Sequence, residues 1–208
     1  MARFVISGTG TDIGKTVFAA GLTGLIGADY WKPIQTGVTL GDRDAPRDAG
    51  FVARMTGARI HPEAVILPEP LSPHRAAELA GVTIDPAAID PPDADPLVIE
   101  GAGGVLVPVT RDLLSADLFV RWGIPVILCA TTGLGTISHT LSAIESLRAR
   151  GCPLHGVAFI GDDNPDNIAT IGQIGGVRVL GRLPRLPDLT PEALARAMRD
   201  HFDAGDFA

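Results

Sequence analysis

Nine residues near the N-terminus, GTGTDIGKT at positions 8 to 16, restrict the fold of this chain more than any other stretch. Gly8, Gly14, Lys15 and Thr16 fit the pattern G-x-x-x-x-G-K-[ST] of a phosphate-binding loop (P-loop). In such a loop backbone N–H groups turn toward the phosphates, Lys15 reaches the β and γ oxygens, and the Thr16 hydroxyl can hold Mg²⁺. The apolar run RFVIS before it and the helical pattern TVFAAGLTGLIG after it disfavour the alternative, a plain glycine-rich turn.

Short apolar runs continue to alternate with helical patterns along the rest of the chain. DYWKPI, PLVIE, PVILCA, HGVAFI and VRVLG indicate strands, and helical patterns lie near residues 136–150, 166–174 and 191–202. Strands this apolar are buried on both faces of a sheet. We therefore predict an α/β fold: a single-domain P-loop NTPase over residues 1–208, with a mostly parallel sheet, helices on both faces, and ligands at the carboxyl ends of the strands.

The composition is that of a globular protein, with 46% hydrophobic residues, 20% charged residues and a net charge of −7. An acidic chain without a basic stripe is not expected to bind nucleic acid or an anionic membrane, so we expect small-molecule partners. No stretch approaches the roughly 20 apolar residues of a membrane span. Because the N-terminus enters a strand directly, without a signal sequence, we expect a cytoplasmic protein.

Lysine is rare in this chain, since Lys15 and Lys32 stand beside fifteen arginines. The phosphate loop accounts for Lys15. Lys32 follows an apolar strand and should project from its carboxyl end toward the same phosphates, where a compact ammonium fits a crowded site better than a wide guanidinium. The alternative is an ordinary exposed lysine.

Acidic residues near the loop are candidates to hold Mg²⁺, which prefers hard oxygen ligands. Glu100 is the best placed, because it ends the strand DADPLVIE and precedes GAGG, whose small residues let a ligand approach the backbone closely. Asp42, Asp44 and Asp48 follow the segment QTG, where spacing does not rank them and each could be a solvated acid at a helix start. The sequence thus favours one metal ligand and leaves the second open.

A second glycine-rich turn, TTGLGTISHT at residues 131–140, leads from a strand into a helix. Its free N–H groups could bind a carboxylate, or it is a plain turn with Thr136 as the helix cap. His139 is expected to face a neighbouring helix or solvent. Cys129 and Cys152 show neither metal-ligand spacing nor a disulfide framework, so we expect both to be packing residues.

Four segments in this order and spacing, SGTGTDIGKT, YWKPIQTG, EPLSPH and VIEGAGGVLVP, resemble the dethiobiotin synthetase family. The later PVILCATTGLGTISHT resembles the family's corresponding strand, loop and helix, so the likeness runs from about residue 4 to 150. Many NTPases share the phosphate loop, whereas KPIQTG together with EGAGG is specific. The resemblance implies a ligase of biotin synthesis that uses ATP and Mg²⁺ to join CO₂, or bicarbonate as its source, to 7,8-diaminononanoate.

In the reaction that this resemblance implies, an amine captures CO₂ as a carbamate and the carbamate takes the γ-phosphoryl group. The second amine then displaces phosphate from the carbamic-phosphoric anhydride and closes a cyclic urea, so no protein nucleophile is required. Lys15, Lys32 and Mg²⁺ would offset the repulsion between the carbamate and the γ-phosphate.

The family's functional positions can be carried over to this sequence. Those matching catalytic positions are Lys15, Lys32 and Thr11, and those matching metal ligands are Thr16, Asp48 and Glu100. Those matching nucleotide contacts are Asp12, Ile13, Gly14, Lys15, Thr16, Val17, Gly161 and Pro184. Those matching substrate contacts are Thr11, Lys32, Thr36, Gly103, Leu134, Gly135, Thr136 and Ile137. By the same resemblance, the substrate's carboxylate would lie on N–H groups of residues 134–137 from the neighbouring subunit of a homodimer.

Two departures from the family pattern affect specificity. Ile160 and Gly161 stand where relatives often carry an Asn whose amide can read the base, which leaves backbone groups near Gly161 and the run RLPRLP, with Pro184, to hold the ring with less discrimination. The nucleotide preference therefore stays open. Ser138 stands where some relatives have Asn.

Three other functions fit the sequence less well. A partition or positioning ATPase would share the fold, but its loop usually carries an additional lysine near its start, and positions 8 to 13 have none; the acidic end HFDAGDFA is also no amphipathic membrane tail. A glutamine-dependent amide synthetase of the cobyrinate type needs a glutaminase domain for which 208 residues leave no room. A scaffold role leaves both lysines and Glu100 unexplained.

Overall fold

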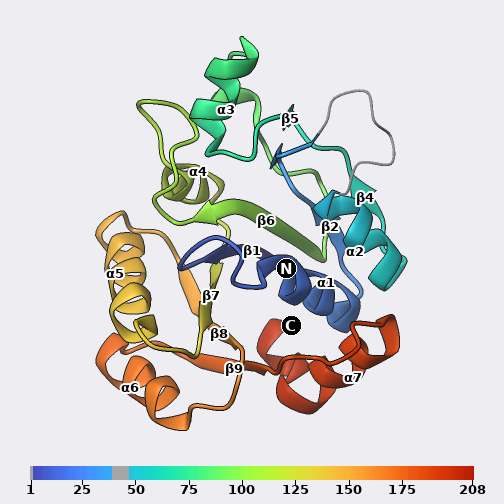
Figure 1. Ribbon diagram of the computed structural model, residues 1–208, viewed down its shortest axis with the longest axis vertical. Coiled ribbons are helices and arrows are strands. Elements are labelled where there is room, and N and C mark those ends of the chain that lie inside the picture. The colour runs from blue at the N-terminus through green and yellow to red at the C-terminus, as the bar shows by residue number, and fades with distance from the viewer. Residues whose placement is uncertain (1, 39–46) are drawn as a thin grey trace.

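A computed structural model of the protein describes residues 2–38 and 47–208 (Figure 1). The strands are β1 (Arg3–Gly8), β2 (Asp29–Trp31), β3 (Ile34–Thr36), β4 (Ile60–His61), β5 (Val65–Leu67), β6 (Leu97–Gly104), β7 (Val126–Thr131), β8 (Leu154–Ile160) and β9 (Val179–Leu183). The helices are α1 (Lys15–Ile26), α2 (Asp48–Thr56), α3 (Pro73–Ala80), α4 (Ser115–Trp122), α5 (Thr136–Ala149), α6 (Pro165–Gly175) and α7 (Pro191–His201), with 3₁₀ turns η1 (Pro86–Ala88) and η2 (Ala204–Phe207).

Seven of the strands form one sheet in the order β4-β2-β6-β1-β7-β8-β9, and every ladder between them is parallel. β3 and β5 form a separate two-stranded parallel ladder. Parallel neighbours need crossover connections, and in this chain helices supply most of them.

Helices cover both faces of the large sheet. Side chains of successive strand residues point to opposite faces, so strands that are apolar throughout have two faces to bury. On one face α1 and α7 bring Phe18 and Met198 against Ile6 of β1. On the other face α4 brings Phe119 into a second apolar cluster with Val5, the neighbour of Ile6. Figure 1 shows α1 and α7 on one side of the sheet and α5 and α6 on the other. The predicted α/β fold class, a P-loop fold with a mostly parallel sheet, is confirmed.

The phosphate loop lies at the centre of the sheet's carboxyl edge, directly after β1. β1 pairs with β6 on one side and β7 on the other. After β1, the chain forms the strands on the β6 side of the sheet and then β7, β8 and β9 on the other side, so the strand order reverses at β1. This reversal point is where open α/β sheets bind ligands.

Two strand predictions are wrong in extent. DYWKPI forms β2 and β3, which belong to different sheets, and between them stand Lys32 and Pro33, which has no N–H for a ladder. β6 does not end at Glu100 but continues to Gly104, so Glu100 lies inside the strand. The predicted helices at 136–150, 166–174 and 191–202 match α5, α6 and α7, whereas α3 and α4, of eight residues each, were missed because they are shorter than the window in which helical periodicity is measured.

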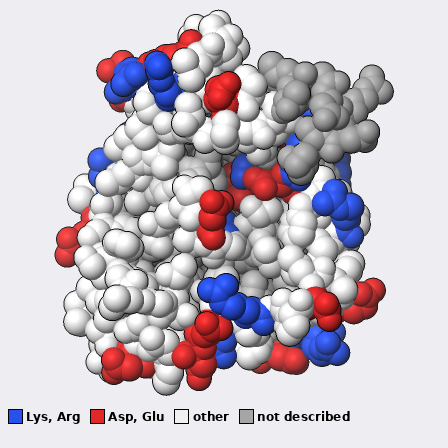
Figure 2. All heavy atoms as spheres, viewed as in Figure 1, with Lys and Arg blue, Asp and Glu red and all other residues white. Residues whose placement is uncertain are grey.

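Charged groups of both signs are interspersed on the molecular face in Figure 2, around a broad uncharged stretch over the α5 side. This face carries no continuous basic stripe among the described residues. Within residues 2–38 and 47–208, no helix combines the length and the apolarity needed to cross a membrane.

Candidate active site

The phosphate loop is held in a tight turn by glycines and by one strained residue. Gly14, the N-cap of α1, has φ 96° and Asp12 has φ 56°, so both adopt left-handed backbone conformations. The Lys15 ammonium donates to the Gly10 carbonyl at 2.8 Å. A Cβ on Gly8 would lie 2.7 Å from Ile13 Cδ1, 2.8 Å from Lys15 Cδ and 3.2 Å from the Gly10 carbonyl oxygen, so a side chain at this position would force its neighbours in the loop to shift.

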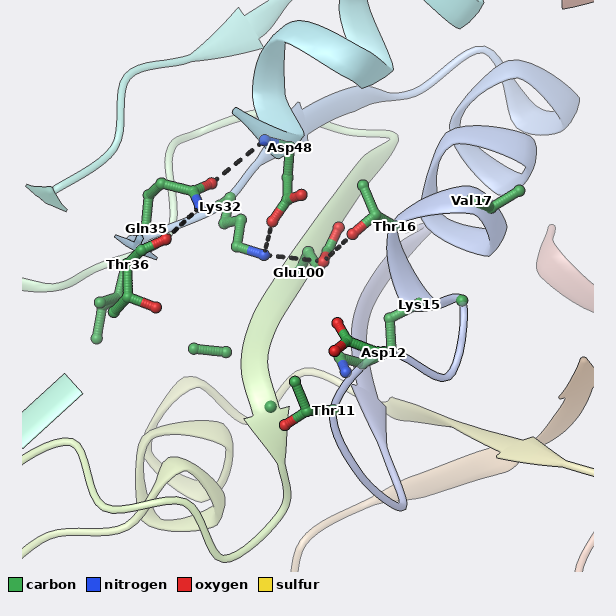
Figure 3. A pocket seen from close by; sticks show the side chains of 14 residues that line it. Thr11, Asp12, Lys15, Thr16, Val17, Lys32, Gln35, Thr36, Asp48 and Glu100 are labelled. Atoms are coloured by element: carbon green, nitrogen blue, oxygen red, sulfur yellow. Dashed lines mark hydrogen bonds and ion pairs between the residues drawn. The ribbon is translucent and has the colours of Figure 1, made fainter. Parts of the chain in front are cut away.

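Beside this loop lies a cluster of charges from three separate elements (Figure 3), in which Lys32 and Glu100 are buried and Asp48 is partly exposed. The Lys32 ammonium, just beyond β2, donates to Glu100 Oε1 at 2.9 Å and to Asp48 Oδ2. Thr16 Oγ1, in the first turn of α1, donates to the same Glu100 Oε1 at 2.7 Å. Only 7% of Lys32 and 1% of Glu100 is exposed. The predicted placement of Lys32 beside the phosphate loop is confirmed, and the residue is not an ordinary exposed lysine.

The two lysines have different electrostatic surroundings. Burial lowers the pKa of Lys32, but the Glu100 and Asp48 carboxylates outweigh this effect and raise the pKa above its ordinary value. Burial also lowers the pKa of Lys15, and the charge of Glu100 opposes this only in part. Lys32 is thus fixed as a cation between two carboxylates. Lys15 forms no salt bridge with a described carboxylate, and it reaches a backbone carbonyl instead.

Tyr30 belongs to this cluster and was not predicted. Its hydroxyl donates to Glu100 Oε2 at 2.7 Å from a fully buried position. Burial, together with the charge of Glu100 and the hydrogen bond to it, raises the pKa of Tyr30 well above its ordinary value, so the phenol keeps its proton and remains a donor. The sequence places Tyr30 two positions before Lys32, a spacing that puts both side chains on one face of an extended segment, but no local pattern pairs Tyr30 with Glu100, which is 70 positions away.

Asp48 is the first residue of α2, and Gln35 orients this helix start. The Asp48 backbone N–H donates to Gln35 Oε1 at 3.3 Å, and Gln35 Nε2 donates to the Thr36 carbonyl at 2.9 Å. The segment KPIQTG is thereby tied to the helix that carries the second carboxylate. Asp42 and Asp44 lie outside the described residues.

One cavity of about 480 Å³ collects most of the predicted site (Figure 3). The predicted residues that line it are Thr11, Asp12, Gly14, Lys15, Thr16, Val17, Lys32, Thr36, Asp48, Glu100 and Gly103. Ile13, Gly161, Pro184 and residues 134–137 are not part of its lining. The residues predicted to contact the phosphates, the metal and the diamine therefore converge, whereas those predicted to contact the base and the substrate carboxylate lie elsewhere.

Thr16, Asp48 and Glu100 form a donor set that fits Mg²⁺. A hydroxyl and two carboxylates supply the hard oxygens that this ion prefers, and Mg²⁺ usually takes one or two carboxylates and completes its shell with phosphates and water. The three side chains face a common space, because Lys32 bridges the two carboxylates and Thr16 reaches one of them. Among the described residues no group of three or more His, Cys, Asp or Glu competes as a metal site.

Comparisons with known proteins agree with this geometry. A family model described as an AAA domain matches residues 2–193. The ATP-dependent dethiobiotin synthetase BioD of Agrobacterium fabrum is 57% identical over 209 residues, which cover 99% of this chain and 96% of that protein. The BioD of Novosphingobium aromaticivorans is 54% identical over 212 residues, covering 100% of both. The chain belongs to the dethiobiotin synthetase family. Both the family and the enzyme class that KPIQTG and EGAGG predicted, an ATP-dependent synthetase, are confirmed.

Solved structures show which fold this member of the dethiobiotin synthetase family shares with more distant proteins. The cell division ATPase MinD of Pyrococcus furiosus superposes with a TM-score of 0.55 at 15% identity, covering 95% of this chain and 89% of that chain. A ParA family ATPase from Chlorobium tepidum gives a TM-score of 0.51 at 12% identity, covering 95% and 90%. At such low identity the likeness shows the P-loop fold alone.

The turn predicted to hold the substrate carboxylate is exposed at its tip. Leu134 and Gly135 lie at the surface, and Gly135, with φ 88°, is the N-cap of α5. Thr136 is the first residue of the helix, and its hydroxyl donates back to the Thr131 carbonyl at 2.5 Å. The alternative in which Thr136 caps the helix is wrong in this detail, because Gly135 is the N-cap and the Thr136 hydroxyl bonds the preceding strand.

The positions expected to hold the base are also separate from the cavity. The Gly161 N–H donates to the Leu183 carbonyl at 3.0 Å, and the Gly161 carbonyl accepts from Arg182 Nη1 at 3.0 Å. Pro184 lines another groove, of about 390 Å³, along α7. Ile160 is the nearer neighbour of the phosphate loop, because a Cβ on Gly14 would lie 3.0 Å from Ile160 Cγ2.

The cysteines occupy packing positions, as predicted. Both are buried and unpaired. Burial raises the pKa of the Cys129 thiol and raises that of Cys152 to about 11. His139 is exposed on α5.

Proposed function

We propose that this chain is an ATP- and Mg²⁺-dependent ligase that joins CO₂ to 7,8-diaminononanoate and closes the cyclic urea of dethiobiotin. One observation carries the proposal: a single cavity collects two lysines, three threonines and three carboxylates at a phosphate loop, in a chain of the dethiobiotin synthetase family. The names of the relatives support ATP as the co-substrate. We place the reaction in the cytoplasm.

The proposed chemistry has three steps. An amine of the diamine attacks CO₂ and loses a proton, which forms a carbamate. A carbamate oxygen then attacks the γ-phosphorus, the bond to the ADP oxygen breaks, and a carbamic-phosphoric anhydride results. The second amine attacks the carbonyl carbon, phosphate leaves with that carbamate oxygen, and loss of a proton completes the ring.

The central difficulty is that an anionic carbamate must approach an anionic γ-phosphate, so cations have to be positioned in advance. Lys32, fixed between Asp48 and Glu100, would stand beside the carbamate, and Lys15 would follow the β and γ oxygens. Mg²⁺, held by Thr16, Asp48 and Glu100, supplies further positive charge at the phosphates when bound. Holding the two anions in line then provides most of the rate acceleration.

The substrate would extend away from these cations. Thr11, Asp12 and Thr36 line the cavity around the place for the diamine, and Gly103 permits a close approach because its backbone carries no side chain there. We propose that the far carboxylate is held by N–H groups of residues 134–137 of a second subunit, since the same turn lies outside this chain's own cavity. The active form would then be a homodimer with shared sites.

The test is product formation from ATP, Mg²⁺, ¹³C-bicarbonate and the diamine, followed by mass spectrometry. Dethiobiotin exceeds the diamine by one carbonyl and lacks two hydrogens, and it should carry the ¹³C label. With ¹⁸O-bicarbonate, one ¹⁸O atom should appear in the released phosphate, because the carbamate oxygen leaves with it. Labelled dethiobiotin with unlabelled phosphate would contradict the anhydride. Parallel reactions with CTP and GTP would define the nucleotide preference.

A different outcome would favour the partition or positioning ATPase. Phosphate release that proceeds without the diamine and responds to a protein or a surface, with no dethiobiotin formed, would reject the ligase proposal. The matched control is the same assay with the diamine but without bicarbonate, where a ligase should release almost no phosphate.

A further inference from the structure

Tyr30 and Glu100 meet because of the register between β2 and β6. Tyr30 pairs with Val98 and Trp31 with Ile99, so Glu100 lies one residue beyond the ladder, beside Lys32. Side chains two apart on a strand share a face, which places Tyr30, Val98 and Glu100 on the side of the sheet that α1 and α2 cover. The phenol therefore reaches the carboxylate diagonally across two neighbouring strands.

The two oxygens of Glu100 are divided between different partners. Oε1 accepts from Thr16 at 2.7 Å and from Lys32 at 2.9 Å, on the side of the cavity. Oε2 accepts from Tyr30 at 2.7 Å. Since only 1% of Glu100 is exposed, water cannot replace a lost donor easily. The Tyr30 hydrogen bond thus holds the plane of the carboxylate, so that the oxygen opposite Tyr30 faces the cavity.

We propose that Tyr30 is a positioning residue for the metal site: its hydroxyl holds Glu100 Oε2 so that Oε1 is presented beside Thr16 to Mg²⁺ and the nucleotide phosphates. The inference rests on the proposed role of Glu100 as a metal ligand. Partners that orient a metal-binding carboxylate by a hydrogen bond commonly change metal affinity when they are lost.

Packing alone does not account for a tyrosine at this position. The ring of Tyr30 belongs to an apolar cluster with Ala49, Val52 and Val98, which a phenylalanine would fill equally well. The chain contains seven phenylalanines and this single tyrosine. Its hydroxyl is directed to the buried carboxylate that also binds Lys32 and Thr16, so the polar atom serves Glu100.

The test compares Tyr30→Phe with the wild type in binding of the β,γ-imido analogue of ATP, measured by calorimetry over a series of Mg²⁺ concentrations. We expect the Mg²⁺ concentration for half-maximal binding to rise about 10- to 100-fold, with binding in EDTA unchanged. The matched control is Trp122→Phe, which removes the hydrogen bond from Trp122 Nε1 to the Ile89 carbonyl, 2.9 Å long, but keeps an aromatic ring. This control should lower thermal stability and leave the Mg²⁺ requirement at the wild-type value.

A double-mutant cycle with Glu100→Gln separates positioning from general destabilisation. If Tyr30 acts through Glu100, Tyr30→Phe should add almost nothing to the Mg²⁺ requirement of Glu100→Gln. An unchanged Mg²⁺ requirement for Tyr30→Phe alone, or its full effect in the Glu100→Gln background, would overturn the proposal. Dethiobiotin formation is assayed separately from binding. If the wild type binds Mg²⁺ and the nucleotide analogue but makes no dethiobiotin, the ligase proposal fails, and the Mg²⁺ titrations still test the role of Tyr30.

Discussion

The phosphate cavity and the turn before α5 lie at the carboxyl edge of one sheet, yet they differ in completeness. In the cavity both oxygens of Glu100 have donors, and the carboxylate is 1% exposed. At the turn, Leu134 is fully exposed and Gly135 lies at the surface. A buried charge without partners is costly, so a site built from charges has to be completed within its own chain. Exposed backbone N–H groups can donate to water at little cost, so a site built from them can stay incomplete until a second molecule binds.

Replacing Lys32 by Arg should have the largest effect, because Lys32 lies in the buried, closely packed cavity. The exchange keeps the charge but places a wide guanidinium between Asp48 and Glu100, where 7% of Lys32 is exposed. We expect the kcat for dethiobiotin formation to fall more than about 100-fold, as for other lost transition-state contacts, while circular dichroism shows an intact fold. Lys32→Met provides the control for loss of charge, and near-normal turnover by Lys32→Arg would refute the crowding argument.

Replacing Glu100 by Gln tests whether the buried acid holds the metal. The amide keeps the size of the side chain and removes one anionic oxygen donor. We expect the Mg²⁺ concentration for half-maximal dethiobiotin formation to rise about 10- to 100-fold. The control is Glu78→Gln, at the exposed ion pair with Arg111, where the Mg²⁺ requirement should not change. A wild-type requirement in Glu100→Gln would assign the acid another task.

How far the sequence predicted these two regions depended on how local each feature is. The phosphate loop lies within nine consecutive residues, so strand, loop and helix were predicted together. The hydrogen bond between Tyr30 and Glu100 joins positions 70 apart and depends on the register of β2 with β6, which no local pattern contains. The split of DYWKPI into two strands likewise depends on a distant partner, because β3 pairs with β5 and not with the large sheet. The role proposed for the turn involves a second chain, about which a single sequence carries little information.

A charge at the exposed turn should have a smaller effect. Leu134→Asp places a carboxylate beside the N–H groups proposed to hold the substrate's own carboxylate, at a position where the side chain makes no buried contact. Two like charges about 4 to 8 Å apart near a protein surface repel by roughly 2 to 4 kcal/mol before salt screening, so we expect the KM for the diamine to rise about 10-fold.

Leu134→Asn is the matched neutral control for this change, and its KM should stay close to that of the wild type. If the turn acts from a neighbouring subunit, mixing Lys32→Arg with Leu134→Asp chains should restore intact sites in about a quarter of the total, because each mixed dimer regains one of two. Equal KM values for the Asp and Asn variants would place the substrate carboxylate elsewhere.

The smallest effect should appear in the rates at which Cys129 and Cys152 are labelled. One thiol lies near the cavity and the other at the far edge of the sheet, so the same molecule provides the comparison. The Cys129 carbonyl accepts from the Thr9 N–H of the phosphate loop at 3.0 Å, whereas Cys152 precedes β8 at the opposite edge. Because burial raises the pKa of both thiols, each holds less thiolate at pH 8 than an exposed cysteine, and labelling requires local opening. The Mg²⁺ complex of the β,γ-imido analogue of ATP should slow labelling of Cys129 a few-fold and leave Cys152 unchanged, as read by mass spectrometry of the labelled peptides. Equal slowing at both thiols would mean that the nucleotide stabilises the whole fold rather than the cavity alone.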